Sequence, residues 1–128
     1  AKLQTKTTQV FASYGMTETI THVALRPVNG ENKTNTYTAL PNVSFDVDHR
    51  GCLIIDAPNL GSSHLVTNDV VTLHDSKSFE WLGRVDNVIN SGGVKLHPEK
   101  IERLLSDFIK VPFIVSSRNK RRSLIFQI

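Results

Sequence analysis

The stretch YGMTET, from Tyr14 to Thr19, brings an aromatic ring, a glycine, hydroxyls and a carboxylate into one short segment. A glycine at the end of a strand lets backbone amides approach a ligand closely. The hydroxyl of Thr17 can hydrogen-bond a phosphate, and the carboxylate of Glu18 can hold Mg²⁺, which prefers oxygen ligands. The ring of Tyr14 offers a flat face for a base. A simple turn with a buried tyrosine and a solvent-facing glutamate fits the same residues, so the hexapeptide alone leaves both interpretations open.

Two further stretches carry side chains suited to a nucleotide. Asp69 in VTNDVV heads an expected strand, where its carboxylate could accept both hydroxyls of a ribose or could simply cap a turn. The stretch WLGRVDNVINSGGVKLHPEKIE joins a strand end at Arg84 to a glycine loop and a helix start. Arginine suits bidentate contacts with phosphate or ribose. Asp86 lies between two dissimilar patterns, where hinge residues typically absorb backbone rotation.

Strands are expected to position the first two of these groups. Val43, Phe45 and Val47 alternate with polar residues, and an apolar run returns after a turn, which predicts a hairpin. A second hairpin follows, and together they predict a small antiparallel β module. The expected strands are 8–12, 20–25, 43–47, 52–55, 69–73 and 79–82, with a loop or edge at 31–38.

The sequence pattern changes after Gly83, and a helical pattern begins at Pro98. Pro98 in a first turn, followed by Glu99 and Glu102 where the helix dipole favours carboxylates, predicts a helix start. Apolar residues then recur with helical spacing to Ile109, and Pro112 ends the helix. We expect its apolar face to belong to the core; this face comprises Ile101, Leu104, Leu105 and Phe108. With strands expected at 113–117 and 123–128, the predicted fold is α+β.

Composition limits the classes of protein to which the chain could belong. With 128 residues and a net charge of +3, it has the size of one domain or of pieces of two. Its single cysteine, Cys52, excludes an internal disulfide and fits a reducing compartment. No signal segment opens the chain, and no apolar run is long enough to span a membrane, so a cytoplasmic location is expected. The histidines lack metal-ligand spacing, and an oligomer is compatible with the sequence.

The order and intervals of YGMTET, TND and GRVDNVINSGGVKLHPEKIE resemble the adenylate-forming superfamily. This superfamily includes acyl- and aryl-CoA ligases, nonribosomal peptide adenylation domains and luciferases, and the resemblance runs from about Val10 to Glu102. Its members use ATP to activate a carboxylic acid as an acyl-AMP and then pass the acyl group to a thiol, usually CoA. ATP, Mg²⁺ and CoA are therefore the ligands that the resemblance implies.

The resemblance also implies a domain organisation. Residues 1–85 would be the C-terminal part of the large AMP-binding domain, an antiparallel β subdomain. Residues 86–128 would be the hinge and the beginning of the small mobile α/β C-terminal domain. Asp86 would be the pivot about which this domain rotates between the two half-reactions. The loop that would line the pantetheine tunnel for CoA comprises Ser91, Gly92, Gly93 and Val94.

Roles in the nucleotide site follow from the same resemblance. Tyr14 would flank the adenine, Thr17 would contact the AMP phosphate, and Glu18 would hold Mg²⁺. Asp69 would bind the ribose hydroxyls, and Arg84 would reach the ribose or a phosphate. The expected catalytic residues are Thr17, Glu18 and Arg84, and the expected nucleotide contacts are Tyr14, Gly15, Met16, Thr17, Asp69 and Arg84.

Within the superfamily, DNVINSGGVKLHPEKIE resembles the 2-succinylbenzoate–CoA ligases of menaquinone biosynthesis, including Asn90 where other members often have lysine. An aromatic dicarboxylate would suit the polar residues at the end of YGMTET and just after it. Thr19 and His22 are the expected substrate contacts, and Thr21 and Arg26 are further candidates. Another acyl- or aryl-CoA ligase, or a carrier-loading adenylation domain, is the alternative.

Departures from the superfamily pattern matter as well. The phosphate loop ending in lysine and the lysine near the far C-terminus are not in the sequence, and SRNKRRS replaces the usual acidic-glycine turn. We therefore expect the chain to be a portion of a longer enzyme and to be inactive by itself. A competing hypothesis is a small nucleic-acid-binding module that uses the basic residues Arg103, Arg118, Lys120, Arg121 and Arg122. The small net charge and the lack of interleaved aromatic residues argue against nucleic acid as a partner.

Overall fold

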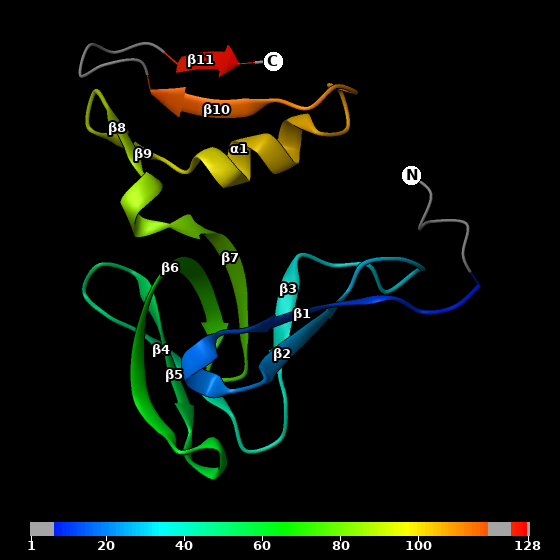
Figure 1. The fold of residues 1–128 in the computed structure, drawn as a ribbon, viewed down its shortest axis with the longest axis vertical. Helices are drawn as coiled ribbons and strands as arrows, with labels where there is room; N and C mark the ends of the chain where they lie inside the picture. Colours follow the sequence, from blue (N-terminus) through cyan, green and yellow to red (C-terminus); the bar gives the residue numbers. More distant parts are fainter. Residues whose placement is uncertain (1–6, 118–123, 128) are drawn as a thin grey trace. The chain divides into compact units, whose positions relative to one another are not determined.

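The computed structural model describes residues 7–117 and 124–127, and it divides the chain into two compact units (Figure 1). The first unit extends to Trp81 and the second begins at Leu82. Within the described residues, no helix is both long and apolar enough to cross a lipid bilayer. Arg118, Lys120, Arg121 and Arg122, the basic residues of the competing nucleic-acid hypothesis other than Arg103, lie outside the described residues.

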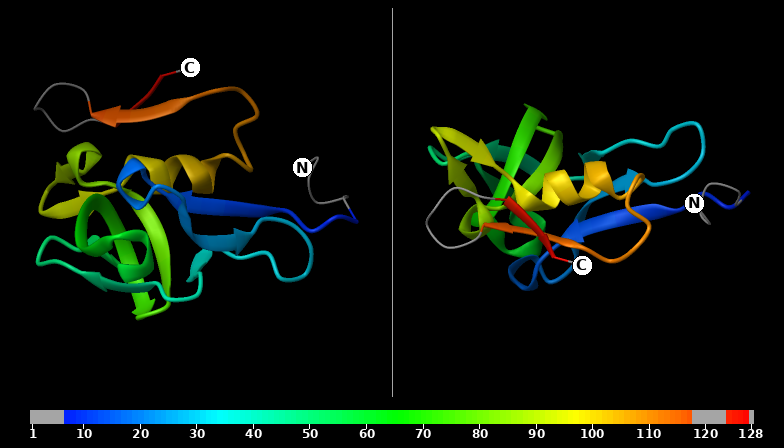
Figure 2. Two further views of the ribbon diagram at one scale, coloured as in Figure 1. Left: turned by 60° about the horizontal axis from the view of Figure 1, so that its bottom comes forward. Right: turned by 90° about the horizontal axis from the view of Figure 1, so that it is seen from above.

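An antiparallel sheet of seven strands forms the first unit, which confirms the predicted β module. Its spatial order is β1-β2-β3-β7-β6-β5-β4, so that β7 lies between β3 and β6. Both the β4–β5 and the β6–β7 hairpins are formed, and Figure 2 shows β5 beside β6. The strands are β1 (Phe11–Gly15), β2 (His22–Pro27), β3 (Thr36–Ala39), β4 (Ser44–Val47), β5 (Cys52–Ala57), β6 (Ser62–Asp75) and β7 (Ser78–Arg84).

The core of this unit is built around Phe79 of β7, whose side chain is completely buried. Its ring lies edge-on to Phe45 with centroids 4.9 Å apart and stacks on Tyr37 at 5.4 Å. Leu53 and Ile55 on β5 are also fully buried. Since burying one large apolar side chain contributes about 1.5–3 kcal/mol, this cluster accounts for much of the stability of the sheet.

Strand boundaries differ from the sequence prediction at several places. β6 has 14 residues, whereas a strand was expected only at 69–73. The pairing of β5 with β6 changes register twice, between Cys52 and Ile54 and between Ile55 and Ala57. Such bulges interrupt simple alternation, which is why the first half of β6 gave no strand pattern. As a result, Asp69 lies inside a long strand and not at the head of one.

The second unit contains two short hairpins and one helix. β8 (Ile89–Ser91) and β9 (Val94–Leu96) are joined by Gly92 and Gly93, whose φ angles are +58° and +85°. Two consecutive residues with positive φ make a type I′ turn, which favours glycine at both positions. The helix α1 spans Pro98–Leu105, and β10 (Ile114–Ser117) pairs with β11 (Leu124–Gln127).

The helix is shorter than its apolar spacing predicts. It ends at Leu105 rather than near Ile109, and the hydroxyl of Ser106 donates a hydrogen bond to the carbonyl of Arg103 at 2.7 Å. Such local side-chain bonds compete with the helical backbone pattern. Leu104 is 62% exposed and Phe108 is 82% exposed, so the expectation that the whole apolar face belongs to the core is wrong.

Candidate functional site

The first two motifs of the sequence meet in the first unit. Tyr14 at the end of β1 donates a hydrogen bond from its hydroxyl to Oδ2 of Asp69 in β6, with an O–O distance of 2.6 Å. The ring of Tyr14 packs against Phe79, with centroids 5.2 Å apart, and therefore has a fixed orientation. The backbone N–H of Asp69 donates to the hydroxyl of Thr67 at 3.1 Å. Asp69 is only 7% exposed, so its carboxylate is held in a well-defined position.

The turn that follows Tyr14 depends on close backbone approach at Gly15. A Cβ at Gly15 would lie 2.6 Å from the carbonyl oxygen of Thr21 and 2.8 Å from Cα of His22. The register of β1 against β2 also shifts between Tyr14 and Gly15. Glycine therefore lets the two paired strands approach closely at this register shift, and the chain then enters the short helix η1 (Thr17–Thr19).

Helix η1 presents two of the expected catalytic side chains to solvent. Thr17 and Glu18 are exposed, whereas Met16 is half-buried against the core. The carbonyl of Glu18 accepts a hydrogen bond from the hydroxyl of Ser62 at 2.9 Å, which fastens the turn to the start of β6. Ile20 then has a φ of +64°. Because positive φ is costly for a β-branched residue, this segment stores strain of the kind that often marks functional sites.

The prediction that Thr19 contacts a substrate is corrected by its burial. Its side chain has no exposed surface, and its hydroxyl accepts a hydrogen bond from the N–H of Met16 at 3.1 Å. The same hydroxyl lies 2.7 Å from the carbonyl oxygen of Thr21, to which it can donate. Thr19 therefore holds the turn together and cannot touch a ligand.

The other residues proposed near the acid are placed differently. His22 and Thr21 are exposed and line a cavity of about 270 Å³ together with residues of the β3–β4 and β5–β6 connections. The guanidinium of Arg26 donates to the carbonyl of Thr34 at 3.1 Å and lies 5.3 Å from the ring centroid of Tyr37. Arg26 is thus a structural residue of the β2–β3 hairpin, while His22 keeps access to the cavity.

The third motif forms a separate cluster in the second unit. The short helix η3 (Val85–Asn87) contains Asp86, and its carboxylate lies 3.6 Å from the guanidinium of Arg84. Both side chains are largely exposed. Exposed ion pairs contribute little to stability. Arg84 can therefore leave Asp86 and bind a negatively charged ligand at little cost.

Sequence reasoning missed the two residues that brace this cluster. Oε1 of Glu99 accepts a hydrogen bond from the side-chain amide of Asn87 at 2.6 Å. A Cβ at Gly83 would meet the same carboxylate, which would have to shift, and the φ of +153° at this position favours glycine. Gly83 and Glu99 are both inside the quoted third motif, but only the fold shows that they touch.

The glycine loop of the third motif is the tip of the β8–β9 hairpin. Gly92, Gly93 and Val94 are exposed, and Ser91 is half-buried. The strands on either side were not predicted, although Gly-Gly between two short apolar runs is a recognised hairpin pattern. The pairing of Ser91 with Val94 closes the turn at the tip.

His97 precedes helix α1, and among the described residues of this unit it has a displaced pKa. Burial lowers the pKa of His97 below its ordinary value of 6.5, against the opposing effect of the Glu99 carboxylate. Within residues 7–117 and 124–127, no group of three or more His, Cys, Asp or Glu side chains could hold a metal ion. A metal ion bound at Glu18 would therefore need further ligands other than such a cluster of described side chains.

Comparison with known proteins places this geometry in context. No protein-family model matches the sequence, and a search of curated proteins found no match. Among solved structures, the chain is similar to an acyl-CoA synthetase (AMP-forming)/AMP-acid ligase II-like protein from Dyadobacter fermentans. The identity is 38% and the TM-score 0.65, and the match covers 89% of this chain and 34% of that one.

Two more distant structures share the fold. O-succinylbenzoate coenzyme A synthetase from Bacillus subtilis, in complex with ATP and magnesium ion, matches with a TM-score of 0.69 at 22% identity, covering 92% of this chain and 30% of that one. Coronafacic acid ligase from Pectobacterium brasiliense matches with a TM-score of 0.67 at 20% identity, covering 94% and 29%. The acids in the names of these two proteins differ, so the likeness to them concerns the fold.

The chain spans about a third of the length of the solved structures that it matches. Its mostly antiparallel sheet followed by one helix corresponds to the C-terminal portion of the AMP-binding domain in these proteins. The chain therefore has the fold of that portion of the AMP-forming acyl-CoA synthetases, and its 38% identity to one such protein supports a place in the adenylate-forming superfamily.

Proposed function

We propose that this chain is part of an ATP-dependent, AMP-forming acid–CoA ligase. In this proposal, residues 1–85 carry the end of the AMP-binding domain, and residues 86–128 carry the hinge and the beginning of the small C-terminal domain. The observation that carries the proposal is the hydrogen bond from Tyr14 to Asp69, which joins two motifs 55 residues apart. It orients a carboxylate beside an aromatic ring, the pair of groups that a ribose and an adenine require.

In the first half-reaction, an oxygen of the substrate carboxylate attacks the α-phosphorus of ATP, and the bond to pyrophosphate breaks. Asp69 would accept hydrogen bonds from the ribose hydroxyls, since each carboxylate oxygen can accept more than one hydrogen bond. Exposed Thr17 would donate to an oxygen of the α-phosphate, where negative charge increases. Arg84 would contact the ribose or a phosphate. Such preorganised donors stabilise the transition state electrostatically.

A magnesium ion fits the donors that η1 presents. Mg²⁺ keeps several water ligands and is commonly held by one or two carboxylates together with substrate phosphates. The single exposed carboxylate of Glu18 meets this requirement, and a cage of several protein ligands is not needed. When bound, the ion would neutralise phosphate charge.

In the second half-reaction, the thiolate of CoA attacks the acyl carbon, and AMP leaves with the electron pair of the broken C–O bond. We propose that the backbone at Asp86 rotates between the two steps and that the hairpin tip from Ser91 to Val94 then lines the thiol channel. Asp86 and the tip residues Gly92, Gly93 and Val94 are exposed, which supports these roles. Hinges of this kind are confined to a few boundary residues.

As the acid we propose 2-succinylbenzoate, which would place the enzyme in menaquinone synthesis. The proposal rests on the wording of the third motif, and the exposed His22 at the 270 Å³ cavity supplies a polar group for a second carboxylate. Another acyl or aryl acid is the alternative within the same mechanism.

The experiment is pyrophosphate release by the full-length product of the gene that encodes this chain, with ATP, Mg²⁺ and CoA. Turnover of 2-succinylbenzoate in preference to benzoate and to a fatty acid would support the complete proposal. Preference for another acid would retain the ligase mechanism and refute the substrate. Release with none of these acids, together with no binding of AMP, would refute the ligase proposal.

A further inference from the structure

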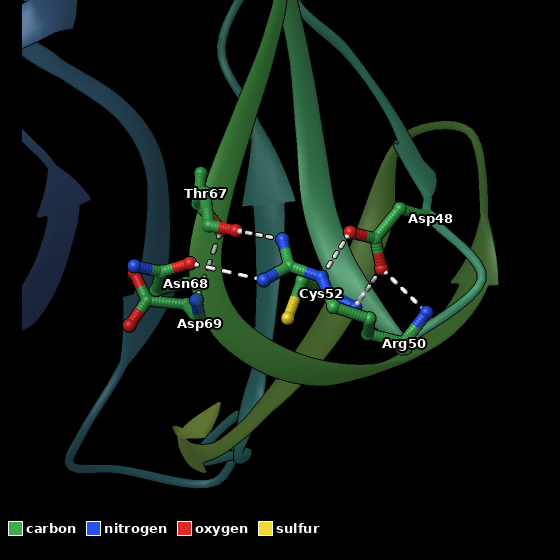
Figure 3. Close-up of polar contacts among 6 residues, drawn as sticks. All are labelled: Asp48, Arg50, Cys52, Thr67, Asn68 and Asp69. Carbon is green, nitrogen blue, oxygen red and sulfur yellow. Dashed lines mark hydrogen bonds and ion pairs between the residues drawn. The ribbon is translucent and has the colours of Figure 1, made fainter. Parts of the chain in front are cut away.

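The turn between β4 and β5 contains an arginine–aspartate pair that the ligase proposal does not use (Figure 3). Oδ2 of Asp48 lies 2.7 Å from Nε of Arg50. Oδ1 of Asp48 accepts hydrogen bonds from the backbone N–H groups of Arg50 at 2.8 Å and of Cys52 at 2.9 Å. Asp48 thus uses both oxygens, and it fixes the conformation of the turn and the direction of the arginine.

Arg50 extends from this turn to the strand that carries Asp69. One terminal nitrogen donates to the side-chain oxygen of Asn68 at 3.3 Å, and the other donates to the backbone carbonyl of Thr67 at 3.3 Å. Figure 3 shows the guanidinium between Asp48 on one side and Thr67 and Asn68 on the other. The two residues that Arg50 holds immediately precede Asp69.

The contacts continue from Thr67 to the carboxylate. The hydroxyl of Thr67 accepts the backbone N–H of Asp69, and the carboxylate of Asp69 accepts the hydroxyl of Tyr14. Arg50 therefore holds the segment from one side, while Tyr14 holds the carboxylate from the other. The orientation of Asp69 depends on both.

The electrostatics of the turn favour a stable ion pair between Asp48 and Arg50. Burial alone would raise the pKa of Asp48, but the N–H of Cys52 and the guanidinium and N–H of Arg50 outweigh it and lower the pKa. The carboxylate thus stays ionised at neutral pH. The side chain of Asp48 is 12% exposed and that of Arg50 is 38% exposed. Partly exposed pairs contribute little to stability, so a role in geometry accounts better for this arrangement.

We infer that Arg50, oriented by Asp48, is a positioning residue that aims the Asp69 carboxylate at the ribose of the nucleotide. This inference rests on the proposed function, because it deepens the role given there to Asp69. Its specific consequence is selectivity for the ribose hydroxyls. Lysine cannot replace Arg50, because a point charge lacks the planar fork that reaches Asp48, Asn68 and the Thr67 carbonyl together.

The test measures dissociation constants of AMP, 2′-deoxy-AMP and 3′-deoxy-AMP by calorimetry with the full-length gene product. For the unaltered protein we expect AMP to bind more tightly than either deoxy analogue. In Arg50→Gln and Arg50→Lys, we expect this preference to fall by about fivefold to tenfold, since a misaimed hydrogen bond to a charged group loses much of its strength. We expect little change in the binding of the deoxy analogue that lacks the hydroxyl contacted by Asp69.

A matched control is available in the other hairpin turn. Asp75 accepts the N–H of Lys77 at 2.6 Å and the hydroxyl of Ser78 at 2.8 Å, so it fixes the β6–β7 turn as Asp48 fixes β4–β5. Asp75 is the last residue of β6, whereas Thr67 and Asn68 lie in the middle of the same strand. Asp75→Asn should loosen a turn and leave the preference for AMP unchanged, whereas Asp48→Asn should lower it.

The outcomes separate this inference from the proposed function. If Asp69→Asn removes the preference for AMP and Arg50→Gln keeps it, the inference is wrong and the ribose role of Asp69 stands. If Asp69→Asn also keeps the preference, or if the unaltered protein shows none, the ribose role fails and the inference fails with it. If Arg50→Gln and Asp75→Asn weaken all three ligands equally, the effect is general loosening and the inference is refuted.

Discussion

The two units of this chain reach their folded forms by different means. In the first unit, Phe79, Leu53, Ile55 and Val23 form a fully buried apolar core between paired strands. In the second, the only buried apolar side chains among those described are Pro98 and Val115, while Leu104, Phe108 and Ile114 remain exposed. Carboxylates also accept hydrogen bonds there, as when Glu99 accepts one from the side-chain amide of Asn87.

This difference indicates how each unit serves a site. A dense core over-determines the positions of nearby polar groups, so Tyr14 and Asp69 are held before any ligand arrives. A unit with little buried apolar surface opens locally at lower cost. Residues proposed to move, such as Asp86, lie in that second kind of structure.

The largest expected effect comes from removing the centre of the first core. Phe79→Ala should lower the free energy of unfolding by about 3–5 kcal/mol, the usual cost of deleting a buried phenylalanine ring. Phe108→Ala is the matched change in the second unit, and at 82% exposure it should alter stability by less than about 0.5 kcal/mol. Urea unfolding of both variants measures this contrast. Equal losses would mean that Phe108 is covered and that the comparison of the two units is mistaken.

A second effect tests the close approach of β1 and β2 at Gly15. Gly15→Ala should cost about 1–3 kcal/mol, because its Cβ would meet backbone atoms that cannot move aside. Gly30→Ala serves as control: its φ is +75° but nothing lies within 4 Å, so only the smaller cost of positive φ applies. Thermal unfolding of the two variants separates crowding from backbone conformation. A Gly15→Ala protein as stable as Gly30→Ala would contradict the close approach.

A third effect concerns the second unit alone. Oε1 of Glu102 accepts the backbone N–H of buried Val115 at 2.7 Å. Glu102→Ala leaves this N–H without its acceptor and should cost about 1–3 kcal/mol, whereas Glu102→Gln keeps an acceptor oxygen and should cost less. Amide hydrogen exchange at Val115 reports the bond directly. Unchanged protection in Glu102→Ala would show that the carboxylate does not brace β10.

The smallest effect is a dependence on pH. Because burial lowers the pKa of His97 in the folded state, the unfolded chain binds more protons at pH values just below 6.5. The contribution of His97 to stability is therefore present above pH 6.5 and is lost as the pH falls through the lowered pKa. In His97→Asn this part of the decline should disappear. Unfolding midpoints of both proteins between pH 7.5 and 5 measure it, and parallel curves would refute the assignment.

Regular patterns allowed part of this structure to be predicted from the sequence. The β4–β5 hairpin followed from the alternation of Val43, Phe45 and Val47, because one face of that strand is buried. The start of α1 followed from Pro98. In contrast, the length of β6 was missed because its bulged pairing with β5 breaks the alternation. The end of α1 was missed because Ser106 competes locally while the apolar spacing continues.

The candidate site was predictable in composition and not in contacts. YGMTET and Asp69 could be chosen from residue types, but their meeting depends on pairing between strands distant in sequence. The error at Thr19 has the same origin. Thr19 was chosen as a polar residue at the nucleotide motif, whereas the chain turns into η1 there and encloses the hydroxyl.

The position of β7 in the sheet has a consequence for the order of folding. Strands β1 to β3 and strands β4 to β6 are two runs of neighbours, and β7 joins them by pairing with β3 through Thr36, Tyr37 and Thr38. Tyr14 belongs to the first run and Asp69 to the second. We therefore expect the contact between them to form only once β7 has paired with both runs of strands. On this expectation, the nucleotide site that we propose would be among the last features of the sheet to form.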